Sequence, residues 1–192
     1  MEADQADAQV AKRYFIALIT RDITLEDAIL DLIDNSVNCA LREFHFDSNR
    51  IGSLISGNEA RSEDLRDINI YLNERRFEIT DTCGGIDIDT ARREMFRFGR
   101  DTPELGDMLS VYGIGLKRAI FKIGQRIVVK SHRADTAFEV DIDVDEWSKK
   151  PTEWFFPLRQ IDPTEAGITN GTTIRVTAVG ARSKCHLSAN YR

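Results

Sequence analysis

The sequence lacks a long apolar run and has only three cysteines among its 192 residues. The longest apolar run near the start, residues 15–19, is far shorter than the roughly 20 residues of a membrane-spanning helix. Met1 opens an acidic stretch, whereas a secretory signal peptide begins with a basic region. Cys39, Cys83 and Cys185 are too widely spaced for a disulfide framework or a metal-binding cysteine cluster. These absences indicate a cytoplasmic protein without membrane contact.

Aromatic residues are also scarce, at 8% of the chain, and there are only four prolines. The rest of the composition, with 42% hydrophobic and 30% charged residues, is typical of a globular protein and excludes a disordered or collagen-like chain. The length corresponds to one ordinary domain. We therefore expect a single domain over residues 1–180, followed by a polar tail at 181–192.

Charge is distributed unevenly along the chain. The net charge is 26 − 32 = −6, but residues 1–96 carry 11 basic and 20 acidic side chains (−9), whereas residues 97–192 carry 15 and 12 (+3). Residues 109–134 contain six basic side chains and no acidic one. This stretch suits an anionic ligand, although a solvated helix and strand face would explain it equally well.

Hydrophobic periodicity predicts helices first and strands last. Helices are expected at residues 6–20, 24–44, 90–98 and 113–123. Strands are expected as a hairpin at 68–72 and 77–80, and then at 126–131, 137–144, 154–161 and 172–179. Polar loops are expected at 47–66 and 100–110. This order predicts an α+β fold, a two-layer α/β sandwich whose mostly antiparallel mixed sheet has helices on one face.

Local signals define two of the helix starts. Thr24 and Asp27 have the spacing of a capping box, in which each residue hydrogen-bonds the other's backbone N–H. Asp89 is placed to cap the helix at 90–98.

A polar stripe runs along the second predicted helix. Asp27, Asp31, Asn35 and Asn38 fall at i, i+4, i+8 and i+11, on one side of a strongly apolar segment. Such a stripe usually faces water. However, Asp and Asn are poor helix formers, so a surface helix would favour Lys, Glu or Gln. A carboxylate and a carboxamide one turn apart can ligate Mg²⁺, and the carboxylate can also act as a general base.

Two glycine-containing segments follow. Asp81 ends a predicted strand just before Gly84 and Gly85, which could be a simple turn. Alternatively, Asp81 could accept a hydrogen bond from an exocyclic amine such as that of adenine, and the glycines would let a flat ring approach the backbone. Gly113 and Gly115 open the next predicted helix and are followed by basic residues, which outlines a phosphate site. The chain contains neither a Walker A motif nor the dinucleotide fingerprint.

Taken in order, residues 31–36, 81–86, 112–117 and 171–172 resemble the four motifs of the GHKL ATPases, the superfamily of gyrase B, Hsp90-type chaperones, histidine kinases and MutL. The third motif is especially similar to that of the Microrchidia ATPases. The resemblance implies the Bergerat fold, with ATP and Mg²⁺ as cofactors. It also implies that Asp31 is catalytic and that Asn35 holds the metal. The implied ATP-binding residues are Asn35, Asp81, Gly85, Ile86, Gly113, Ile114, Gly115, Leu116, Lys117 and Thr172.

The resemblance further implies an ATP-hydrolysing, N-terminal module of a larger protein, with residues 100–110 as a lid that closes over the nucleotide. Family members of the gyrase, MutL and Microrchidia type use ATP to close dimers, and a second domain supplies a lysine to the γ-phosphate, so we expect weak or no turnover by this chain alone. Two positions depart from the family pattern. Asp31 stands where a glutamate is usual, and Cys83 stands where the second motif has its first glycine.

Three alternatives remain open. The chain could be a non-hydrolysing switch whose lid is ordered by ATP or ADP. It could be a histidine-kinase-like phosphotransfer domain, although that family usually has Asn at position 31. Finally, residues 109–134 could contact DNA, an interpretation that the low aromatic content does not favour.

Overall fold

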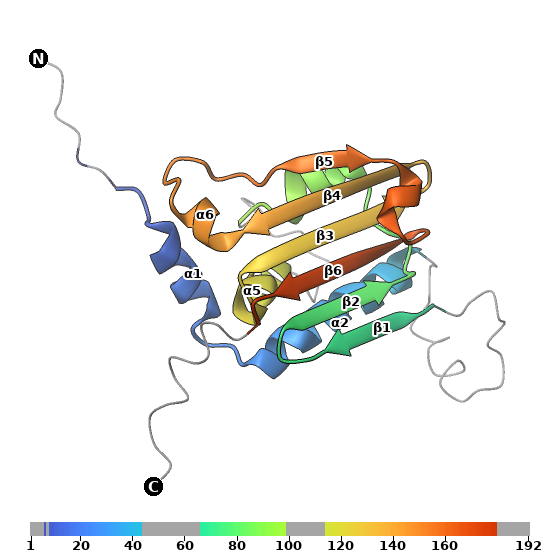
Figure 1. Ribbon diagram of the computed structural model, residues 1–192, viewed down its shortest axis with the longest axis horizontal. Helices are drawn as coiled ribbons and strands as arrows, with labels where there is room; N and C mark the ends of the chain where they lie inside the picture. Colours follow the sequence, from blue (N-terminus) through green and yellow to red (C-terminus); the bar gives the residue numbers. More distant parts are fainter. Residues whose placement is uncertain (1–5, 7, 44–65, 99–113, 180–192) are drawn as a thin grey trace, which may run out of the picture.

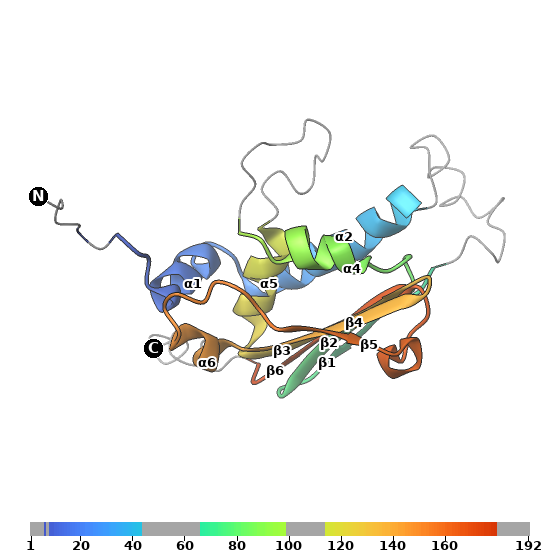
Figure 2. The same cartoon turned by 90° about the horizontal axis from the view of Figure 1, so that it is seen from above.

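The computed structural model describes residues 6, 8–43, 66–98 and 114–179. Within these ranges a single sheet is covered on one face by helices (Figures 1 and 2), which is the predicted α+β two-layer architecture. Several predicted features lie outside the described residues: the lid at 100–110, the tail at 181–192, most of the loop at 47–66, and Gly113. No helix in the described ranges has the length and hydropathy of a membrane span.

The sheet has six strands in the order β1-β2-β6-β3-β4-β5, and every pairing between them is antiparallel. The strands are β1 (Ile68–Leu72), β2 (Arg76–Asp81), β3 (Arg126–Arg133), β4 (Thr136–Asp143), β5 (Leu158–Ile161) and β6 (Gly171–Thr177). The last strand in the sequence therefore lies in the middle of the sheet. There it joins the β1-β2 hairpin to the β3-β4-β5 meander (Figure 1).

The helices lie mainly on one face of this sheet (Figure 2). They are α1 (Lys12–Thr20), α2 (Leu25–Glu43), α4 (Ile88–Thr90), η2 (Ala91–Met95), α5 (Gly115–Ile123), α6 (Val144–Ser148) and η3 (Pro163–Ala166). The predicted capping box of α2 is confirmed. The backbone N–H of Thr24 donates to Asp27 at 2.9 Å, and the backbone N–H of Asp27 donates to the Thr24 hydroxyl at 3.0 Å.

Two predictions of helix starts were wrong. The first helix begins at Lys12 and not at residue 6, because Ala11 has an extended backbone (ψ 127°). The helix predicted at 90–98 is capped by Asp87 and not by Asp89. The Asp87 carboxylate accepts a hydrogen bond from the Thr90 backbone N–H at 2.8 Å, so the first turn starts earlier. This helix then widens into the π-helical turn η2, a conformation that is frequent at functional sites.

The face of the sheet that meets the helices is built from rows of side chains across neighbouring strands. One such apolar row consists of Ile79, Ile174, Val129 and Val140. Every second residue of a strand points to the same face, so a further apolar row lies two residues away toward one end of the sheet. Toward the other end, the next row is polar on β2, β6 and β3, where it consists of the buried residues Asp81, Thr172 and Ser131; on β4 it continues to Phe138. A buried polar row next to an apolar core marks a candidate site.

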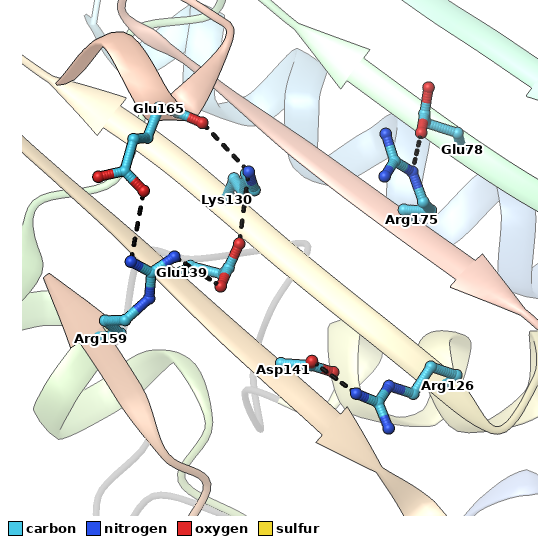
Figure 3. Close-up of polar contacts among 8 residues, drawn as sticks. All are labelled: Glu78, Arg126, Lys130, Glu139, Asp141, Arg159, Glu165 and Arg175. Atoms are coloured by element: carbon cyan, nitrogen blue, oxygen red, sulfur yellow. Dashed lines mark hydrogen bonds and ion pairs between the residues drawn. The ribbon is translucent and has the colours of Figure 1, made fainter. Parts of the chain in front are cut away.

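The opposite face of the sheet is charged. Figure 3 shows four ion pairs across its strands: Lys130–Glu139 at 3.3 Å, Arg159–Glu139 at 3.1 Å, Arg126–Asp141 at 2.7 Å, and Arg175–Glu78. Exposed pairs of this kind each contribute only about 0–1 kcal/mol to stability. Their main consequence is that this face stays solvated, so the apolar residues of the sheet are left to the helix-covered side.

Candidate functional site

A pocket of about 380 Å³ lies between the helix layer and the polar row of the sheet. Its walls come from α2, the α4-η2 segment, α5, the segment after β2, and the central strands. The lining residues are Leu32, Asn35, Ser36, Cys39, Asp81, Ile86, Thr90, Glu94, Met95, Leu116, Lys117, Thr172 and Ile174. Residues of all four sequence motifs therefore line a single pocket, although these motifs are up to 141 positions apart (172 − 31).

Asp81 is held rigidly at the floor of the pocket. Its side chain accepts hydrogen bonds from the Ser36 hydroxyl at 2.7 Å, from the backbone N–H of Cys83 at 3.0 Å, and from that of Thr172 at 3.3 Å. The residue is only 7% exposed. A carboxylate has about four acceptor sites, so these three bonds leave capacity for one more donor. Asp81 can therefore accept a hydrogen bond from a ligand amine, and its carboxylate is fixed in position to do so.

Two glycines next to Asp81 are required by close backbone packing. Gly85 has φ +70°, and a Cβ there would lie 2.1 Å from the carbonyl oxygen of His132. A Cβ on Gly171 would lie 1.9 Å from the carbonyl oxygen of Asp81. Ile86, which follows Gly85 in the sequence, lines the pocket, and its backbone N–H donates to Ser131 Oγ at 2.8 Å. These contacts explain why the sequence has glycine at both positions.

Asn35 lines the pocket from α2, one turn after Asp31. Its Nδ2 atom is buried and has no hydrogen-bond partner among the described residues. The O and N atoms of a carboxamide can be interchanged by a 180° flip, so either could face a ligand. No group of three or more His, Cys, Asp or Glu suited to a metal occurs in the described part of the chain. A single carboxamide ligand suits Mg²⁺, which keeps several waters and takes further oxygens from phosphates.

The first turn of α5 contributes Leu116 and Lys117 to the pocket. Lys117 is only 2% exposed, and its Nζ donates to the carbonyl oxygen of Met95 at 3.1 Å. Gly115 begins the helix, and the N-cap residue Ile114 makes no side-chain capping bond. Backbone N–H groups and a cation at a helix start can bind an anion. This end of the pocket can therefore hold phosphate.

The polar stripe of α2 does not act as one unit. Asp27 belongs to the capping box and is exposed, whereas Asn35 lines the pocket. Asp31 is not among the lining residues, and its carboxylate forms an ion pair with Arg118 of α5. Its catalytic role stays a prediction.

Reasoning from the sequence missed several residues of the site. Ser36 and Ser131 hydrogen-bond the Asp81 and Thr172 row, Cys39 lines the pocket from α2, and Thr90 and Glu94 line it from the α4-η2 segment. Ser36 directly follows Asn35, so its place in the first motif was an available signal. Ser131 could be identified only once β6 was known to lie beside β3.

The two described cysteines differ in burial. Burial and the negative charge of Asp81 raise the pKa of the Cys83 thiol to about 12, so this side chain stays protonated. Cys39 is half-buried, and its Sγ donates to the carbonyl oxygen of Cys83 at 2.9 Å. Cys83 therefore packs as a small buried group beside the pocket, where the family usually has glycine.

A family model described as histidine kinase-, DNA gyrase B- and HSP90-like ATPase matches residues 23–175. The match begins just before α2 and ends within β6, so it includes all four motif segments and the whole pocket. No curated protein matches the chain. Because the matched range covers most of the 192 residues, the chain belongs to the GHKL ATPase superfamily and contains its ATP-binding domain.

Proposed function

We propose that this chain is a Mg²⁺-dependent ATP-binding domain that hydrolyses ATP slowly and acts as the N-terminal module of a larger protein. The observation that carries the proposal is that Asp81, Asn35 and Lys117 all line the same pocket. An amine acceptor, a metal ligand and a buried cation are the three groups that a magnesium-bound purine triphosphate needs.

The two ends of the pocket suit the two ends of the nucleotide. Asp81 and Thr172 would bind adenine, with the backbone at Gly85 and Ile86 beside the ring. Leu116 and Lys117 would contact the phosphates, together with Ile114, Gly115 and Gly113, the last of which lies outside the described residues.

Asn35 would hold Mg²⁺ together with phosphate oxygens. The bound ion would neutralise phosphate charge during hydrolysis. Asp31 is the proposed general base, which would take a proton from the attacking water. Glu94 is an alternative, because its side chain lines the pocket whereas that of Asp31 does not.

The larger context is part of the same proposal. The lid at 100–110, an ATP-dependent homodimer, a downstream domain that supplies a lysine, and a relationship to the Microrchidia ATPases all extend the motif resemblance. A non-hydrolysing switch and a phosphotransfer domain would use the same pocket, so nucleotide binding alone does not separate them from an ATPase.

The decisive experiment is calorimetry of Mg-ATP binding by the wild type and by Asp81→Asn. We expect Asp81→Asn to raise the Kd by about 10-fold to 100-fold, because it replaces an acceptor-only carboxylate with an amide. Asp141→Asn, which removes the same charge from the opposite face of the sheet, is the matched control and should change the Kd less than about twofold. Equal losses in both variants, or no binding by the wild type, would contradict the proposal.

A phosphate-release assay on the same proteins separates the ATPase from the two alternatives. The ATPase proposal expects slow release that disappears in Asp81→Asn. Binding without any release would favour the switch or the phosphotransfer domain.

A further inference from the structure

The catalytic carboxylate proposed above is engaged by a cation that does not line the pocket. Asp31 Oδ2 accepts a hydrogen bond from Arg118 Nε at 2.9 Å, and Asp31 Oδ1 accepts one from Arg118 Nη2 at 3.3 Å. Both carboxylate oxygens are therefore engaged by one guanidinium. Arg118 directly follows Lys117, so the residue that pairs with Asp31 is covalently joined to the proposed phosphate lysine.

This ion pair is neither fully buried nor freely exposed. The Asp31 side chain is 24% exposed and that of Arg118 is 38% exposed. Two-point guanidinium–carboxylate pairs are geometrically specific and stronger than single hydrogen bonds between neutral groups. Partial solvent access nevertheless keeps the pair weak enough to open. The contact can therefore act as a restraint that thermal motion overcomes at intervals.

The neighbouring carboxylate of Asp27 does not compete with Asp31 for Arg118. Asp27 lies one turn earlier on α2, but its carboxylate is used by the capping box. The pKa of Asp27 is lowered mainly by the hydrogen bond from the Thr24 backbone N–H, and the charge of Arg118 adds only a smaller effect. Arg118 thus has Asp31 as its close carboxylate partner.

A general base must direct a lone pair at the attacking water within hydrogen-bond reach. Aspartate is one methylene shorter than the glutamate that the family usually has at this position, so its carboxylate has less reach from the helix. It is therefore poorly suited to keep both bonds to Arg118 and still approach a water in the pocket.

We infer that Arg118 is a restraining residue, whose two hydrogen bonds hold the Asp31 carboxylate outside the pocket so that opening of this ion pair limits ATP turnover. This inference rests on the proposed ATPase function. Arg118 acts through Asp31 and does not itself touch the nucleotide.

The test compares Arg118→Gln with Lys122→Gln, a loss of equal charge on the same helix, where Lys122 Nζ donates to the Thr20 carbonyl oxygen at 3.2 Å. At saturating Mg-ATP, we expect kcat to rise about threefold to fivefold in Arg118→Gln, which corresponds to the strength of a partly exposed ion pair. KM and the calorimetric Kd should stay within about twofold, because Arg118 does not line the pocket. Lys122→Gln should leave kcat unchanged.

The double variant Arg118→Gln with Asp31→Asn identifies the carboxylate that gains freedom. We expect it to show no increase over Asp31→Asn alone. An increase that persists without Asp31 would overturn the inference and point to another base such as Glu94. An unchanged or reduced kcat in Arg118→Gln, with nucleotide binding intact, would also overturn it.

Arg118→Lys covers the case in which Arg118→Gln does not fold. Lysine keeps the charge but cannot make the two-point contact, so a smaller rise of about twofold supports the restraint and no rise contradicts it. Wild-type calorimetry separates the two proposals. If Mg-ATP binds but the wild type shows no turnover, Asp31-dependent turnover in Arg118→Gln supports the inference, and its absence overturns only the inference. No binding would refute the proposed function and this inference with it.

Discussion

Two lysines of the helix layer, Lys12 on α1 and Lys117 on α5, are equally buried at 2% exposure but lie in different surroundings. The Nζ of Lys12 donates to the carbonyl oxygens of Trp147, Lys150 and Glu153. It also lies 4.1 Å from the centroid of the Trp147 ring. Lys117 donates to the carbonyl oxygen of Met95 and lines the pocket. Burial of a cation therefore does not by itself mark a functional site. The adjoining cavity makes the difference.

The regions around the two lysines have opposite chemistry. Phe98 packs edge-to-face on Phe15, with ring centroids 4.9 Å apart, and nearly parallel to Phe121, with centroids 6.3 Å apart. Trp147 stacks on Phe121 at 5.9 Å. Lys12 thus lies in a tightly packed aromatic cluster, whereas Lys117 lines the same pocket as the polar residues Asp81 and Thr172. Four predictions test this difference.

The largest expected effect is on stability. Lys12→Met should lower the free energy of unfolding by about 2–4 kcal/mol, because three backbone carbonyls lose their charged donor. Urea denaturation measures this loss. Under conditions where the variant is folded, its Kd for Mg-ATP should stay within about twofold of the wild type, since Lys12 is not among the lining residues. A loss below about 1 kcal/mol would show that the three hydrogen bonds of Lys12 contribute little to the free energy of unfolding.

Lys117→Met should show the reverse pattern. Its Kd for Mg-ATP should rise about 10-fold to 100-fold, because a buried cation that contacts phosphate is replaced by a neutral side chain of similar length. Its free energy of unfolding should change by less than about 1 kcal/mol. Calorimetry and urea denaturation on the same sample provide both numbers. Equal stability losses in Lys12→Met and Lys117→Met would break the comparison.

Cysteine labelling gives a smaller effect and reports on the pocket directly. In a Cys185→Ser background, iodoacetamide should label Cys39, which lines the pocket, and not Cys83, whose raised pKa of about 12 keeps it as an unreactive thiol. Mg-ATP at four times its Kd should slow Cys39 labelling about fivefold, as expected for simple occupancy. Mass spectrometry identifies the labelled residue. Labelling of Cys39 that ATP does not slow would place the nucleotide elsewhere.

The smallest effect is a pH dependence specific to Lys12. Burial lowers the pKa of Lys12 below 10.5 in the folded protein. In the interval between the lowered pKa and 10.5, the unfolded chain binds more protons, so stability contributed by this group rises with pH. The stability difference between wild type and Lys12→Met should therefore grow by less than about 1 kcal/mol from pH 7 to pH 10. A difference that shrinks over this range would have the wrong sign.

Sequence patterns predicted the regular elements well and their ends less well. The α2 capping box and the β1-β2 hairpin depend on residues close together in the chain, so both were predictable. The π-helical turn after Thr90 and the short helix α6 were not predicted, although α6 has a local signal: its N-cap Asp143 accepts a hydrogen bond from the Glu146 backbone N–H at 3.0 Å. Helix termini are also intrinsically hard to define to better than one or two residues.

In the candidate site, too, some residues were predictable from the sequence and others were not. Asp81, Asn35 and Lys117 were chosen from their side-chain chemistry and from glycine spacing, and all three line the pocket. The contacts of Ser131 and Arg118 were not predicted. Their partners, Thr172 and Asp31, are far from them in the sequence. Each acquires its role from an element that packs beside it: β6 beside β3 in one case and α2 beside α5 in the other.

The sequence by itself determined the composition of the motifs, the period of each element and the capping box of α2, because these depend on neighbours along the chain. Only the tertiary structure decided which motif residues share a cavity and which are diverted. The insertion of β6 between β2 and β3 brings Thr172 and Ser131 into register with Asp81. The packing of α5 against α2 pairs Asp31 with Arg118. Contacts between distant segments depend on how whole elements pack, and no local pattern encodes that.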